Sequence, residues 1–213
     1  MPLFIARWIE FLLLFVGLPM AVLALGHRWI MILVLWSAAA LIFVRLKKSP
    51  GFSYAAEWNM AAVPRQWKHI AIRFLIVCVL FLPLFTWWFQ SDLLFSLIRQ
   101  RPILWGVIMV VYPVFSVWPQ ELIFRSWINH RYAALWRNEI GFVTLSALAF
   151  GFTHVIFQNW VAMILSTLGG VLFAHTYRQH KSLALCCLEH ALCGCAVFTI
   201  GLGQYFYSGV HFH

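Results

Sequence analysis

The sequence contains little charge and very few acidic residues. Of its 213 residues, 10% are charged and 63% are hydrophobic, and 6 Asp and Glu residues stand against 15 Lys and Arg residues. A soluble domain has about 25% charged and about 45–50% apolar residues. The composition therefore excludes an ordinary soluble domain and predicts an integral membrane protein.

Regular alternation of apolar and polar residues is also missing. A membrane β-barrel would show short alternating segments, whereas the apolar runs here are long and continuous. The basic residues gather between these runs and form no basic face with interleaved aromatic residues. This pattern excludes nucleic acid as the expected partner and fits contact with anionic lipid headgroups. We therefore predict an all-α, polytopic helical bundle in a lipid bilayer.

Metal and redox motifs are lacking as well. No C-x-x-C pair is followed by a second pair, so neither a zinc ribbon nor a redox motif is indicated, and the helical H-E-x-x-H spacing is absent. All five cysteines lie inside apolar runs, where buried free thiols are expected. They are Cys78, Cys186, Cys187, Cys193 and Cys195.

About seven apolar stretches predict transmembrane helices in one membrane-embedded domain, residues 1–213. We expect spans over residues 11–25, 29–44, 70–89, 103 to about 132, 141–157, 160–177 and 183–202. Residues 49–69 are expected to form an interfacial loop with a short surface helix, and residues 91–101 a short loop. With the N-terminus inside, the inner segments carry eleven Lys and Arg residues and the outer segments three, which favours that orientation.

Ionisable side chains lie deep inside three of these spans. The fourth carries Glu121 and Arg125, which share a helix face because they are four residues apart. The fifth carries His154, and the seventh carries Glu189 and His190. A charged group at the bilayer centre costs roughly 2.5–3.5 kcal/mol on insertion scales. Taken alone, Glu121 with Arg125 could be a structural ion pair, and each histidine could be a core residue with its hydrogen bonds made. Ionisable residues on three spans together predict a shared, water-filled site.

One carboxylate and two imidazoles suit general acid–base chemistry on water. Glu121 is the expected general base, His154 is expected to orient or activate the water, and His190 is expected to stabilise the oxyanion. Arg125 is expected to hold Glu121 or a substrate carboxylate. Glu with two His is also a zinc ligand combination, so metal-free and zinc-dependent catalysis both stay open.

Three motifs in order resemble those of the CPBP family, the CAAX-protease and bacteriocin-processing membrane proteases. The matching positions are Gln120, Glu121 and Arg125 for E-E-x-x-x-R, Phe150 and His154 for F-x-x-x-H, and His190 with Gly194 for a His followed four residues later by a polar residue. The resemblance spans about residues 103–202, the expected catalytic core, which follows N-terminal helices and the interfacial loop in residues 1–89.

The resemblance implies an intramembrane endopeptidase that uses glutamate-activated water. We expect no cofactor, and a divalent metal such as zinc stays open as the alternative. The expected partners of this endopeptidase are the bilayer and a peptide or protein with a membrane-associated cleavage site, and its expected location is a bacterial inner membrane. Two positions depart from the family pattern. Gln120 stands where the family has its first Glu, the expected base, and Gly194 stands where a polar side chain would donate to the oxyanion. The alternative is therefore an inactive relative, a membrane carrier or an assembly partner.

Overall fold

The computed structural model describes residues 2–26, 28–136 and 138–206, and within these ranges the chain forms helices and no strands. Within these described ranges, seven helical stretches are long and apolar enough to cross a membrane, which confirms the all-α bundle. They are Leu3–Leu25, Ile30–Lys47, Tyr54–Leu93, Pro102–Arg131, Glu139–Phe157, Trp160–His180 and Leu183–Ile200. The N-terminus-in orientation stays a prediction.

The first two spans pack on the fourth. They consist of α1 (Pro2–Leu12), a π-helical segment (Leu13–Gly17), α2 (Leu18–Leu25) and α3 (Arg28–Lys47). Phe15 packs on Phe124, with ring centroids 5.5 Å apart. In the last turn of α1, Glu10 accepts two hydrogen bonds from Arg131, at 2.9 and 2.7 Å. Apolar packing and this ion pair together fix α1 against the part of the chain that carries Glu121.

The third span begins earlier than the sequence suggested. After the short helix α4 (Tyr54–Trp58), α5 (Ala62–Phe74) runs through a π-helical segment (Leu75–Phe81) into α6 (Leu82–Gln90). The predicted interfacial loop is therefore wrong for residues 62–69, which are helical. Pro64 lies in the first turn of α5, where no backbone N–H is needed, and the polar residues of this turn face outward while Ala62 and Ile70 are buried.

Two short helical segments connect the third span to the fourth. The fourth span itself contains two π-helical segments. Residues 91–101, predicted to be a loop, hold a 3₁₀ turn (Ser91–Leu93) and α7 (Ser96–Gln100). The fourth span then comprises α8 (Pro102–Tyr112), π-helical Pro113–Val117, α9 (Trp118–Glu121), π-helical Leu122–Trp127 and α10 (Ile128–Arg131). Proline removes a backbone donor from a helix, and Pro113 opens the first π-helical segment. Such segments often occur at functional sites.

The last three spans form the centre of the bundle. They are α11 (Glu139–Thr153), α12 (Trp160–His180) and α13 (Leu183–Ile200), with 3₁₀ turns Ala133–Leu135, His154–Phe157 and Leu202–Phe206. Three small residues at four-residue spacing on α12 are buried and form one face of the helix: Ser166, Gly170 and Ala174. A Cβ at Gly170 would lie 3.0 Å from Cα of Ala147, so the absence of a side chain lets α11 and α12 pack closely.

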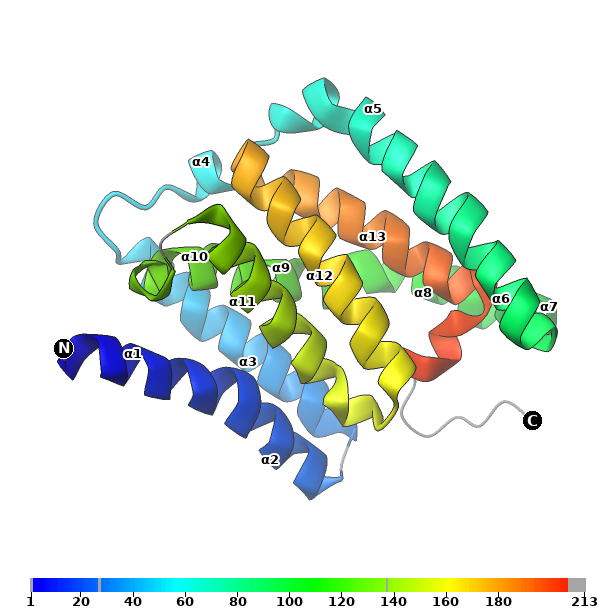
Figure 1. The fold of residues 1–213 in the computed structure, drawn as a ribbon, viewed down its shortest axis with the longest axis horizontal. Helices are drawn as coiled ribbons and strands as arrows, with labels where there is room; N and C mark the ends of the chain where they lie inside the picture. The colour runs from blue at the N-terminus through cyan, green and yellow to red at the C-terminus, as the bar shows by residue number, and fades with distance from the viewer. Residues whose placement is uncertain (1, 27, 137, 207–213) are drawn as a thin grey trace.

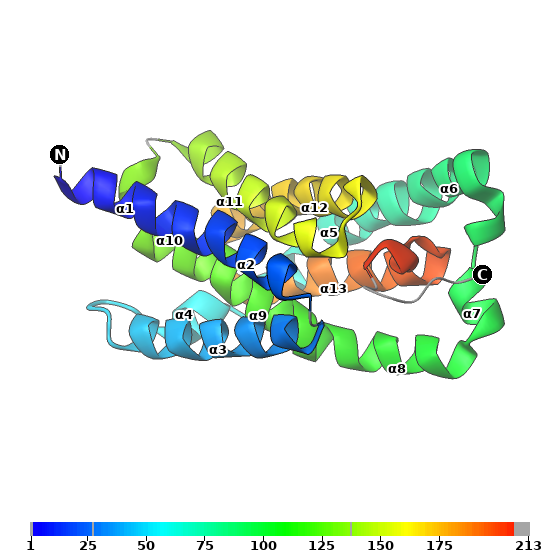
Figure 2. The ribbon, with the colours of Figure 1, turned by 90° about the horizontal axis from the view of Figure 1, so that it is seen from below.

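Helix α13 is surrounded by other helices and carries His190. It contacts α5, α8 and α12. Figure 1 shows α13 between α12 and α5, and Figure 2 shows it between α12 on one side and α8 on the other. All five cysteines are free, and Cys78 and Cys186 are buried. The bundle therefore brings α9 and α13, far apart in the sequence, into contact at the level of Glu121.

Candidate functional site

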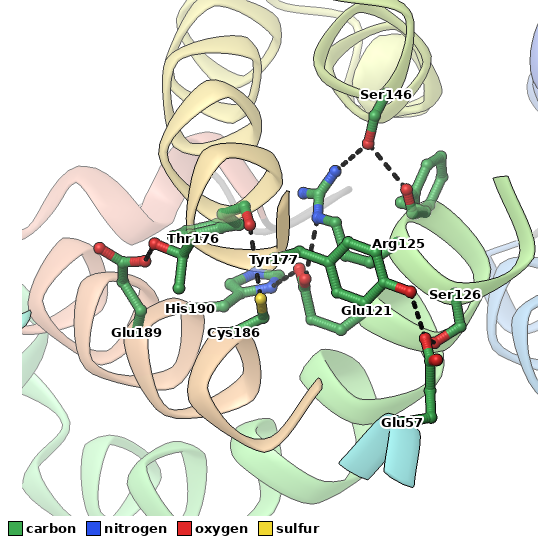
Figure 3. Close-up of polar contacts among 12 residues, drawn as sticks. Glu57, Glu121, Arg125, Ser126, Ser146, Thr176, Tyr177, Cys186, Glu189 and His190 are labelled. Atoms are coloured by element: carbon green, nitrogen blue, oxygen red, sulfur yellow. Dashed lines mark hydrogen bonds and ion pairs between the residues drawn. The ribbon is translucent and has the colours of Figure 1, made fainter. Parts of the chain in front are cut away.

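Glu121 lies at the end of α9 and binds two partners at once. Its Oε1 accepts a hydrogen bond from Nδ1 of His190 at 2.8 Å, and its Oε2 accepts one from Nε of Arg125 at 2.9 Å (Figure 3). Glu121 and Arg125 are fully buried, and His190 is 5% exposed. Two of the three residues that the sequence predicted to meet, Glu121 and His190, are therefore in direct contact.

Arg125 is held in place from several sides. It donates to Glu121 and to the Ser146 hydroxyl, and that hydroxyl donates to the Phe124 carbonyl at 2.7 Å. Its Nη2 has no hydrogen-bond partner among the described residues, but the guanidinium lies 5.3 Å from the centroid of the Phe150 ring, where a cation–π interaction stabilises it. Of the two roles expected for Arg125, the contact with Glu121 is the one that this geometry favours.

The His190 imidazole is fixed in both orientation and tautomer. A carboxylate only accepts, so Nδ1 carries the hydrogen that points to Glu121 and Nε2 of the neutral ring is an acceptor. Nε2 lies 2.9 Å from the Tyr112 hydroxyl, which donates to it. The ring stacks on Phe173 with centroids 4.6 Å apart and an interplanar angle of 17°. The arrangement presents a basic nitrogen on the side away from the carboxylate.

His154 lies at the end of α11, apart from the Glu121 pair. Its Nδ1 donates to the Phe150 carbonyl at 2.8 Å. The Phe150 ring lies 4.9 Å from the His154 ring and 5.4 Å from the His190 ring, by centroids. Phe150 therefore contacts both imidazoles, while the His154 hydrogen bond goes to the Phe150 carbonyl, and Glu121 is paired with Arg125 and His190.

A cavity of about 610 Å³ joins the two histidines. Both line it, whereas Glu121 and Arg125 do not. Gln120 also lines it, and its amide donates to the Ser116 hydroxyl at 2.6 Å. Most of the wall is apolar and comes from α2, α3, α8 and α13, and some of its residues are exposed on the outside, such as Val107 at 51%. The cavity is thus an apolar chamber with a few polar groups at the histidines.

A second buried ion pair is separate from this site. Glu189 forms an ion pair with Arg73 at 2.9 Å and accepts from the Thr176 hydroxyl at 2.6 Å. It is 2% exposed, and Figure 3 shows it directed away from Glu121 and His190. Although the sequence placed Glu189 among the ionisable residues of the seventh span, its contacts hold α5, α12 and α13 together.

Residues outside the motifs also belong to the site. Ser146 forms a hydrogen bond with Arg125, and Tyr112 forms one with His190. Neither residue was predicted from the sequence. In the described part of the chain, no group of three or more His, Cys, Asp or Glu side chains is arranged to hold a metal ion. Catalysis without a metal stays a prediction.

The comparisons with known proteins agree with the motifs. A family model described as type II CAAX prenyl endopeptidase Rce1-like matches residues 99–196. No curated protein and no solved structure matches the chain. The matched segment runs from α7 into α13 and contains Glu121, His154 and His190. Residues 99–196 are therefore similar to the CAAX-type membrane endopeptidases that this model describes.

Proposed function

We propose that this protein is an integral-membrane endopeptidase that hydrolyses a peptide bond inside the apolar cavity. The observation that carries the proposal is the Glu121–His190 hydrogen bond of 2.8 Å. The imidazole that Glu121 binds in this way lines a cavity of about 610 Å³. A buried carboxylate that orients an imidazole toward substrate is the arrangement by which a histidine becomes a general base. The family model that residues 99–196 match describes endopeptidases.

In the proposed mechanism, His190 takes the proton and Glu121 acts through it. Nε2 removes a proton from a water molecule as the water oxygen attacks the carbonyl carbon, and Glu121 stabilises the imidazolium that forms. The C–N bond then breaks, and the same proton passes from Nε2 to the leaving nitrogen. Arg125 and Ser146 keep the carboxylate in place, and His154 supplies a second imidazole at the cavity.

The direct role of Glu121 as the base, which the sequence suggested, stays a prediction. Two observations favour the indirect role. Both carboxylate oxygens already have a partner, and Glu121 is fully buried and does not line the cavity. Gln120 does line the cavity, but an amide is a poor base. A water molecule can therefore reach His190 more easily than it can reach Glu121.

The substrate is proposed to carry a long apolar group. Because the cavity wall is mostly apolar and includes residues exposed on the outer face of the bundle, a chain can enter from the bilayer. The family description names CAAX prenyl endopeptidases, so a C-a-a-X peptide with a farnesylated cysteine is the first probe. A bacterial inner membrane remains the proposed location, and a peptide and the bilayer the proposed partners.

The test uses purified protein in lipid nanodiscs and a fluorogenic farnesylated C-a-a-X peptide. We expect cleavage by the wild-type protein and none by His190→Ala, with both variants folded. Cleavage of the same peptide without farnesyl measures how much the apolar group contributes. Equal activity of His190→Ala and wild type contradicts the proposed mechanism.

A second candidate is a catalytically inactive relative that binds a membrane partner. Gln120 and the full engagement of Glu121 by two partners favour it. Under this reading the wild-type protein binds the farnesylated peptide but releases no product. A product from the wild-type protein that is absent with His190→Ala decides against it.

A further inference from the structure

The hydroxyl of Tyr112 occupies the nitrogen of His190 that Glu121 leaves free. It lies 2.9 Å from Nε2. Tyr112 is the last residue of α8, directly before the π-helical segment that starts at Pro113. Tyr112 and His190 both line the cavity. The hydroxyl is therefore located where the proposed hydrolysis requires water and a carbonyl group to meet.

Gly194 is what allows Tyr112 to reach this position. His190, Gly194 and Phe198 follow one another at four-residue spacing and share one face of α13. The Tyr112 ring lies across this face, 6.0 Å from the His190 ring and 5.5 Å from the Phe198 ring by centroids. A Cβ at position 194 would collide with the ring and hydroxyl of Tyr112. A side chain at 194 and the contact between Tyr112 and His190 are therefore mutually exclusive.

We propose that Tyr112 is a catalytic residue whose hydroxyl donates a hydrogen bond to the substrate's carbonyl oxygen as negative charge develops there. Gly194 makes room for this hydroxyl. The inference rests on the proposed function. The polar group that the family motif would place at position 194 of α13 is thus supplied from α8 by a residue distant in sequence.

The hydroxyl changes its partner during the reaction but keeps its proton. Without substrate, it donates to Nε2 of His190. When a water molecule binds Nε2, the O–H turns to the adjacent carbonyl oxygen. As the water oxygen bonds to the carbonyl carbon, the C=O π electrons move to the oxygen that Tyr112 stabilises, and the water proton goes to Nε2. When the C–N bond breaks, its electron pair and the proton on Nε2 go to the leaving nitrogen, the oxyanion electrons re-form the C=O bond, and the hydrogen bond from Tyr112 weakens.

An apolar site increases the stabilisation that such a hydrogen-bond donor gives to the transition state. Hydrogen bonds to a developing oxyanion are stronger where water is excluded, and removing one donor costs about 10²–10³-fold in kcat. The Tyr112 ring packs against Gly194 and Phe198 on one face of α13, so the hydroxyl is already oriented before the substrate arrives. Pre-orientation avoids an ordering cost at the moment of reaction.

The first test compares Tyr112→Phe with wild type on the farnesylated C-a-a-X peptide in nanodiscs. We expect kcat to fall by about 10²–10³-fold with little change in KM, because the ring still fills its place. Tyr205→Phe is the matched control, since the Tyr205 hydroxyl binds Gln90 at 2.5 Å and does not line the cavity. Its kcat is expected to equal that of wild type.

The second test uses position 194. Gly194→Ala should displace the Tyr112 ring and lower kcat as much as Tyr112→Phe does, although this variant keeps the Tyr112 hydroxyl. In a Tyr112→Ala background, Gly194→Asn places an amide in the vacated space and should raise kcat at least about tenfold, since an amide can serve as an oxyanion donor. Gly194→Ala in the same background should have no further effect, because the two positions are coupled.

The possible results separate the inference from the proposed function. If wild type cleaves the peptide and Tyr112→Phe retains its kcat, the role of Tyr112 is refuted while the peptidase stands. If wild type cleaves nothing, both are refuted. If Tyr112→Phe does not fold, Gly194→Ala decides, because it moves the ring without removing it: unchanged kcat in that variant refutes the inference.

Discussion

Replacing Glu121 by Gln keeps the volume of the side chain and removes its charge. The carboxylate only accepts, but an amide also donates. If the amide NH₂ faces His190, Nδ1 must accept and Nε2 must carry the hydrogen, so Nε2 can no longer take a proton from water. An amide in place of the carboxylate of a catalytic triad costs about 10⁴-fold in kcat. By transition-state arithmetic this loss is about 5 kcal/mol.

The same substitution also affects stability. Arg125 is fully buried, and in Glu121→Gln its partners become a neutral amide oxygen and the Ser146 hydroxyl, with no carboxylate to balance its charge. Removing one partner of a buried ion pair costs about 3–5 kcal/mol of unfolding free energy. The unfolding of wild type and Glu121→Gln in detergent measures this cost, and kcat must be compared at a temperature where both are folded.

Glu189→Gln is the matched control for Glu121→Gln. Glu189 is the neighbour of His190 in sequence, is 2% exposed and pairs with Arg73 at 2.9 Å, but faces away from the site. The Arg73 side chain is 28% exposed, so the loss of stability should be smaller. We expect Glu189→Gln to keep its kcat. A kcat above about a tenth of wild type for Glu121→Gln, or an equal loss in both variants, refutes the reasoning.

The remaining predictions concern the groups around this pair. Ser146→Ala leaves a buried donor of Arg125 unsatisfied and should lower the unfolding free energy by about 1–3 kcal/mol; an unchanged unfolding midpoint in detergent contradicts this. His154→Ala should lower kcat by about 10²-fold and leave stability nearly unchanged, because its ring lies at the cavity and outside the buried ion pair; kcat and thermal unfolding measure the two effects. Chelation with EDTA should leave cleavage unchanged, and a loss that zinc restores contradicts metal-free catalysis.

The number and places of the spans followed from the sequence because long apolar runs have few alternatives to a membrane helix. The boundaries of a span are harder to predict where polar residues are helical. Residues 62–69 are polar on one face only, so composition suggested a loop, whereas buried Ala62 and Ile70 anchor them as the first turns of α5. Likewise, a proline removes a helical hydrogen bond, but the sequence around Pro113 does not show that the fourth span forms π-helical segments there.

The contact between Glu121 and His190 was predictable because charged groups buried in lipid must find one another. The separation of His154 from this pair was not, since its place depends on how α11 ends and on the Phe150 ring beside it. Tyr112 gave no signal of its own within an apolar run. The absence of a side chain at Gly194 was visible in the sequence, but its meaning depends on which ring of another helix lies against it.

The most direct test of the account is peptide hydrolysis in oxygen-18-labelled water by wild type and by His190→Ala. The account predicts that wild type releases a product with one labelled oxygen in its new carboxyl group, and that folded His190→Ala releases none. Product formation by His190→Ala at the wild-type rate, or wild-type product without the label, contradicts water activation by the Glu121–His190 pair.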